Sequence, residues 1–219
     1  ITPVIGEAWR AHRVALVGVG SNNLMGWRPA AARIVIEARS RRVREVGFLV
    51  RGDIELDSFA QAITEGMLFG SFDDRRYKTG EEPDRLPTEE MSLRVLSGGN
   101  DETAIEEGVR RGQAIGSSAN LARELSNEPP NLLTPRVFAE RARAIVRDQG
   151  VEVEVLGESE IEALGMGMIL GVAQGSVEPP RLVVMKYSPA EATSRPVLGL
   201  VGKGVTFDTG GISIKPSES

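Results

Sequence analysis

The segment LGLVGKGVTFDTGG, residues 198–211, has the pattern of a buried strand that runs directly into a glycine-rich loop. Ligand sites of α/β domains lie beyond the carboxyl ends of strands, and glycines let the backbone fold tightly around a ligand. Charged side chains begin at this point, with Lys203 and Asp208 in the loop and Lys215 shortly after it. We therefore expect an α/β fold with a ligand site at the end of this strand.

The residue types in this loop favour a metal site. A carboxylate such as Asp208 supplies hard oxygen ligands for a divalent cation and can bridge two ions. A lysine amine binds a metal only after it has lost its proton, which arginine does not do. Only 4 of the 26 basic residues are lysine, and two of these, Lys203 and Lys215, lie in this segment. This distribution indicates that the two positions need an amine specifically.

Two other interpretations of the Asp208 loop stay open. Asp-Thr-Gly can be a simple turn, in which the Asp side chain bonds its own backbone and Gly provides a positive φ. Phe-Asp-Thr-Gly also occurs in aspartic proteases, where two such carboxylates share one proton. Those enzymes need two copies on an all-β framework, whereas this chain has one copy after an α/β pattern.

The first half of the chain alternates β-branched runs with helical patterns, which is typical of parallel α/β units. Its last helical pattern carries small residues at steps of three and four, so another surface can approach it closely. Pro129 and Pro130 cannot continue a helix, and we place the domain junction there. The predicted strands are 14–19, 43–50 and 91–96, the predicted helices are 27–42, 57–69 and 101–125, and 73–90 is predicted to be an exposed loop.

The second half begins with the helix that has the clearest end signals in the sequence. Thr134 is the expected N-cap, Pro135 the first helical residue, and Gly150 the residue just past the end. Strands predicted at 151–155, 181–187 and 196–201 would form a second sheet.

The composition excludes several classes of protein. The absence of cysteine rules out disulfides and thiolate metal ligands, and no apolar run approaches the ~20 residues of a membrane span. The net charge of -5 disfavours a general binder of phosphate backbones, so we interpret the arginine-rich stretch 28–51 as a solvated helix face. These properties favour a cytoplasmic protein.

Three further features carry little weight. His12 is the single histidine, it precedes the first predicted strand, and we assign it no role. Gly18 and Gly20 after a strand suggest a dinucleotide-binding loop, but Asn23 stands where the third glycine of that motif should be. We interpret Gln174-Gly175-Ser176 as a structural turn in preference to a functional one.

Four segments of the chain, in the same order, resemble the leucyl (cytosol) aminopeptidase family. The longest is Lys-Gly-Val-Thr-Phe-Asp-Thr-Gly-Gly-Ile-Ser-Ile-Lys-Pro, residues 203–216, which is similar to the family's metal-binding segment almost residue for residue. The resemblance spans most of the chain. The other segments are 127–131 with Thr134 and Pro135, 171–176 with 179–182, and 62–66 with 77–79.

The resemblance implies a metal-dependent aminopeptidase that releases N-terminal residues, preferably leucine or another bulky apolar residue, from peptides. It implies that Lys203 ligates one of two divalent ions, that Asp208 bridges both ions, and that Lys215 is a catalytic residue at the substrate carbonyl. A neutral Lys203 beside a protonated Lys215 would follow from their different distances from the ions. The expected ions are Zn, with Mn or Mg as alternatives, and the expected assembly is a homo-hexamer in the cytoplasm.

The same resemblance implies an α/β architecture in three parts. Residues 1–100 would form an N-terminal macro-domain-like α/β domain, 101–125 a connecting helix, and 126–219 the first part of a zinc-exopeptidase-like α/β catalytic domain. Family members carry three further carboxylates and an arginine after this segment, so we expect the 219 residues to be an incomplete stretch that is inactive alone.

Two hypotheses from other classes stay open. The chain could be a non-catalytic binding or assembly module that kept the glycine-rich segment and lost the other metal ligands. Nucleic-acid binding through the arginine-rich stretch is a more distant hypothesis, because the chain as a whole is acidic.

Overall fold

The computed structural model describes residues 2–3, 11–21, 23–49, 54–73, 75–80, 86–96, 99, 101–190, 192 and 196–207. The chain divides into two compact units, Ile1–Asn127 (unit 1) and Glu128–Ser219 (unit 2). Helices and strands are present in both units, which confirms the predicted α/β class.

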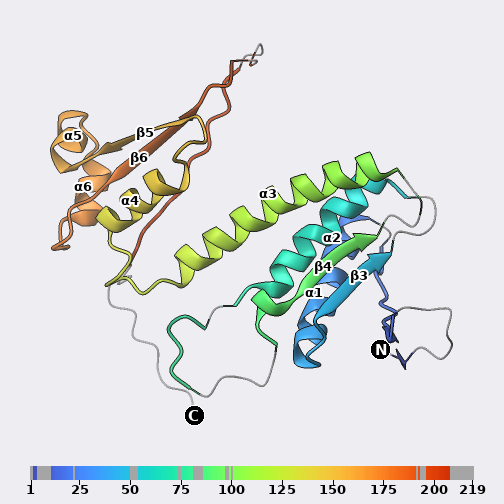
Figure 1. Cartoon of the computed structure of the whole chain (residues 1–219). Helices are drawn as coiled ribbons and strands as arrows, with labels where there is room; N and C mark the ends of the chain where they lie inside the picture. Colours follow the sequence, from blue (N-terminus) through green and yellow to red (C-terminus); the bar gives the residue numbers. More distant parts are fainter. Residues whose placement is uncertain are drawn as a thin grey trace. The chain divides into compact units, whose positions relative to one another are not determined.

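Unit 1 is built around a strand-helix-strand motif. Its strands β3 (Glu45–Leu49) and β4 (Ser92–Leu96) pair in parallel, from Glu45 opposite Ser92 to Leu49 opposite Leu96. Figure 1 shows the two strands side by side, with helix α2 between α1 and α3. The helices are α1 (Leu24–Ser40), α2 (Leu56–Ser71) and α3 (Glu102–Asn127), the short 3₁₀ helix η1 is Thr88–Glu90, and the small strands β1 (Thr2–Pro3) and β2 (Arg13–Val14) pair antiparallel.

The core of unit 1 lies between the sheet and helices α1 and α2. Trp27 and Val35 of α1 and Met67 of α2 are buried there, and Phe48 of β3 and Val95 of β4 pack against them. The ring of Trp27 meets the ring of Phe59 edge to face, with 5.2 Å between centroids. These contacts explain why α1 and α2 carry their apolar residues at helical spacing.

Helix α3 packs against α2 through glycines. A Cβ atom built on Gly112 would lie 2.7 Å from the backbone oxygen of Gln61 and 2.7 Å from Cβ of Thr64, and one on Gly116 would lie 2.6 Å from Cδ1 of Leu68. Side chains at these positions would therefore push the two helices apart. The prediction that the small residues allow another surface to approach closely is confirmed, and the surface is α2.

Two predictions about unit 1 are wrong in part. Arg39, expected on a solvated helix face, is 3% exposed, and its guanidinium donates to the backbone oxygens of Leu86 and Ser71 and to Asp73. Leu86, expected in an exposed loop, is 1% exposed. Burying a guanidinium is tolerated because several acceptors surround it. Arg39 is part of α1, and its hydrogen bonds thus hold the segment that follows α2 against this helix.

Unit 2 holds an antiparallel strand pair with short helices. Strands β5 (Val151–Leu156) and β6 (Leu182–Tyr187) pair from Val151 opposite Tyr187 to Leu156 opposite Leu182. The helices are α4 (Pro135–Ile145), α5 (Glu158–Ala163) and α6 (Gly167–Ala173), with α4 in contact with β6 and α5 with β5 (Figure 1). The hydroxyl of Thr134 accepts from the backbone N–H of Val137, as the predicted N-cap requires.

Three element predictions differ from the structure. Residues 15–19 and 196–201 are not strands, and α4 ends at Ile145, with turns from 146 to 150 before the strand. Helices α5 and α6 were not predicted, because each spans fewer than two full turns and shows too little periodicity. The missing strands lack a partner within the described part of the chain.

The first prediction concerns the α2–α3 contact. We expect Gly112→Ala to destabilise unit 1 by about 1–2 kcal/mol, because overpacking costs more than the helix propensity that alanine gains. Ser117→Ala, on the exposed side of α3, should change stability by only a few tenths of a kcal/mol. Urea unfolding followed by tryptophan fluorescence measures this, since both tryptophans lie in unit 1. Equal stability of the two variants would contradict the packing argument.

The second prediction concerns an ion pair between α2 and α3. Arg111 donates to Asp57 at 2.6 Å and, with the backbone N–H of Ser58, lowers the pKa of the Asp57 carboxyl below its usual value of 3.8. A lowered pKa in the folded state means that the stabilisation is present above about pH 4 and is lost as the pH falls through the lowered pKa.

We therefore expect the unfolding temperature of unit 1 to fall less between pH 5 and pH 2 in Asp57→Asn than in the unsubstituted protein. The two side chains are 42% and 39% exposed, so 1 M salt should reduce the difference. Glu45→Gln at the start of β3 is the matched control. An identical pH profile for Asp57→Asn and the unsubstituted protein would refute the role of the pair.

Candidate metal centre

Lys203 is the one predicted site residue that falls within the described part of the chain. It is exposed, and it lies in residues 196–207, which form neither helix nor strand. Asp208 and Lys215, the predicted bridging ligand and catalytic residue, lie outside the described residues. The structure therefore describes Lys203 of the candidate site, whereas the role of Asp208 stays a prediction.

The carboxylates of the described residues do not gather into a metal site. Within these residues no three His, Asp or Glu side chains lie close enough together to hold an ion. Of the residues predicted to bind the metal ions, Lys203 is therefore the one that the structure describes. Any complete site also needs Asp208 and further oxygen ligands.

The segment that carries Lys203 lies against α4. A Cβ atom built on Gly204 would be 3.9 Å from Cζ and 4.0 Å from Cε1 of Phe138, which is ordinary van der Waals contact. Cβ atoms built on Gly199 and Gly202 would have nothing within 4 Å. The ring of Phe138 on α4 therefore lies near Gly204, the residue that directly follows Lys203.

The entry of the chain into α4 is fixed by a buried ion pair. Arg141 donates to the carboxylate of Glu128 at 2.8 Å, and the Glu128 side chain is 1% exposed. Ala139 and Ala142 of the same helix are buried as well. A buried carboxylate is costly without a charged partner, so this pair ties the residues before α4 to the helix.

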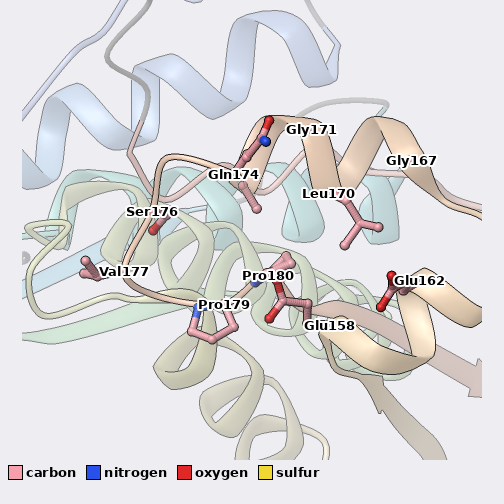
Figure 2. Close-up of a pocket in the computed structure, with 11 residues that line it drawn as sticks. Glu158, Glu162, Gly167, Leu170, Gly171, Gln174, Ser176, Val177, Pro179 and Pro180 are labelled. Atoms are coloured by element: carbon pink, nitrogen blue, oxygen red, sulfur yellow. The ribbon is translucent and has the colours of Figure 1, made fainter.

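An open pocket of about 640 Å³ lies elsewhere in unit 2. Figure 2 shows it between α6, which carries Leu170, and Glu158 and Glu162 of α5, with the turn around Ser176 at its edge. Gln174 and Ser176, interpreted from the sequence as a structural turn, line this pocket. Lys203 is not among the described residues that line it.

The remaining sequence candidates have structural explanations. Asn23 accepts a hydrogen bond from the backbone N–H of Met25 and caps α1. His12 is exposed. Lys186 lies 3.9 Å from Glu152 across the β5–β6 pair and is exposed. Among the described residues, no helix combines the length and the apolar character that a membrane crossing requires.

Comparison with protein families and curated proteins identifies relatives of this chain. Residues 120–219 match the cytosol aminopeptidase family, catalytic domain. The chain is 42% identical over 212 residues to a probable cytosol aminopeptidase of Solibacter usitatus, covering 95% of this chain and 43% of that protein. It is 39% identical over 218 residues to a probable cytosol aminopeptidase of Acidobacterium capsulatum, covering 97% and 42%. The chain therefore spans less than half the length of these curated relatives.

Solved structures that resemble this chain include a leucine aminopeptidase. A tomato leucine aminopeptidase mutant superimposes with a TM-score of 0.76 and 27% sequence identity, covering 87% of this chain and 38% of that chain. The bottromycin maturation enzyme BotP in complex with Mn superimposes with a TM-score of 0.63 and 27% identity, covering 78% and 35%. The similarity to the first structure includes most of both units.

Proposed function

Because the chain belongs to the cytosol aminopeptidase family, we propose that the protein that carries it is a metal-dependent aminopeptidase. It would release N-terminal residues from peptides, with a preference for leucine or other bulky apolar residues. The observation that carries the proposal is the 42% identity over 95% of the chain, together with the segment that begins at Lys203.

Three residues would form the part of the active site that this chain supplies. Lys203 would ligate one ion through its amine, Asp208 would bridge two ions through its carboxylate, and Lys215 would stabilise the negative charge that develops on the substrate carbonyl. Arginine cannot replace the first of these functions, because its guanidinium does not lose its proton. The scarcity of lysine in the chain supports this assignment.

The chain supplies some of the ligand atoms that a divalent metal ion requires. Lys203 is exposed on a segment outside regular secondary structure, and Asp208 follows in the same glycine-rich loop. Bound divalent ions would polarise the scissile carbonyl and activate water at neutral pH. A related structure contains Mn, and we propose two ions per active site, Zn first and Mn or Mg as alternatives.

The organisation of the protein is part of the same proposal. Residues 1–100 would form an accessory α/β domain, 101–125 a connecting helix and 126–219 the first part of the catalytic domain. A homo-hexamer in the cytoplasm is the proposed form, supported by the family resemblance. The protein would act on peptides with a free amino terminus.

The third prediction tests the metal ligand. In the full-length protein that carries this chain, we expect Lys203→Arg to lower the number of bound Mn²⁺ ions from two to one per active site, because arginine keeps the charge and loses the donor lone pair. Lys186→Arg is the matched control, since Lys186 is an exposed lysine on β6. A Mn²⁺ titration that follows the EPR signal of the free ion counts the ions. Two ions in Lys203→Arg would remove Lys203 from the donor set.

The fourth prediction tests the catalytic step. The full-length protein should hydrolyse leucine p-nitroanilide and should not hydrolyse its N-acetyl derivative, because the amino terminus must be free. Lys215→Arg should keep both ions and slow kcat by about 10²-fold, the cost of a displaced oxyanion donor. If the unsubstituted protein binds no metal and releases no leucine, the non-catalytic binding module becomes the better hypothesis.

A further inference from the structure

The carboxylate of Glu65 on α2 is almost completely buried. Its side chain is 1% exposed, and its Oε2 forms an ion pair with Nε of Arg28 on α1. The other oxygen, Oε1, accepts from Nε2 of Gln61, one turn earlier on α2, at 2.8 Å. A buried carboxylate needs such partners, and Glu65 has one on each oxygen. Because little water screens this charge, it acts strongly on the groups that contact it.

Gln61 connects the buried carboxylate to α3. The carboxamide oxygen of Gln61 accepts from Nε of Arg111 at 3.2 Å. The amide therefore directs its NH₂ group at a carboxylate and its oxygen at a guanidinium. The opposite orientation would place donor against donor and acceptor against acceptor. The charges at the two ends polarise the amide in the same direction, so each of its hydrogen bonds strengthens the other.

Arg111 joins α3 to α2 where the two backbones come closest. Its guanidinium also donates to Asp57 of α2 at 2.6 Å and lies 3.6 Å from Glu107 of its own helix. Gly108 and Gly112 lie against the α2 backbone at this level. Glycine has no side chain that could add contacts of its own. The attraction between the helices here therefore depends on other residues, and Arg111 is one of them.

We propose that Glu65, Gln61 and Arg111 form a charge relay, through which a carboxylate whose partners lie on α1 and α2 helps to hold α3. The inference goes beyond the proposed function and does not depend on a metal centre, because all three residues lie in unit 1. Residues 120–127 of α3 are also the first residues that match the family's catalytic domain. The relay is thus a conformational device that acts on the helix at which this match begins.

The fifth prediction is an effect of Glu65→Gln on α3. Glutamine has nearly the shape of glutamate but no charge, so it should weaken the pull on the Gln61 amide and, through it, the hold on Arg111. In the full-length protein that carries this chain, we expect hydrogen exchange of the amides of residues 108–116 to become about 2- to 10-fold faster, as is typical of side chains in one hydrogen-bond network. Mass spectrometry of α3 peptides measures this. Glu37→Gln, which removes a paired carboxylate of α1, should leave α3 unchanged.

A Gln61→Met background separates the relay from general destabilisation. Methionine has a similar length but lacks the amide, so it cuts the connection between Glu65 and Arg111 and leaves the Arg28–Glu65 and Arg111–Asp57 ion pairs in place. In this background Glu65→Gln should change α3 exchange by less than about 2-fold. Equal acceleration in both backgrounds would overturn the proposal, because a weakened core would then explain it. Unchanged exchange in Glu65→Gln alone would also overturn it.

Gln61→Met decides the question by itself if Glu65→Gln does not fold, because it keeps all the charges. It should accelerate exchange in α3 and leave the amides of α1 unchanged. Exchange of α3 at the rate of the unsubstituted protein would refute the relay. The proposed function would still stand in that case, because metal counting in Lys203→Arg and the release of leucine test it separately.

Discussion

The pairing of backbone N–H and C=O groups between strands decides the architecture of both units. Strand β3 pairs with β4, and β5 with β6, and in each case a run of β-prone residues has a second run of matching length. Residues 15–19 and 196–201 are also rich in β-prone residues, but they pair with no other strand among the described residues. A β-prone sequence becomes a strand only where a partner satisfies its backbone groups.

The features of the fold that depend on local chemistry could be read from the sequence. Helix α4 has its cap at Thr134, and α3 shows its contact face through Gly112 and Gly116, because capping and close approach need those residue types. The burial of Arg39 could not be predicted, since its acceptors at Ser71 and Leu86 are distant in the chain. Sequence patterns report short-range chemistry, whereas such burial depends on which segments the fold brings together.

The candidate site likewise has one part that the sequence predicts and another part that it does not. Lys203 stands out in the sequence because lysine is rare in a chain rich in arginine, and a chemical requirement explains that choice. Its surroundings follow no such signal, because α4, whose Phe138 ring lies near Gly204, is distant from the loop in the sequence. The identity of a metal ligand can thus be inferred from composition, whereas its surroundings depend on which segments the fold brings together.

The cap of α1 has a consequence for nucleotides. A loop of the dinucleotide type binds pyrophosphate through the free N–H groups at the start of its helix. In this chain the Asn23 carboxamide oxygen already accepts from the N–H of Met25 at 3.0 Å, so a phosphate would have to displace a built-in acceptor. The Asn23 side chain thus already uses one of the N–H groups at the start of α1 that an anion would otherwise bind.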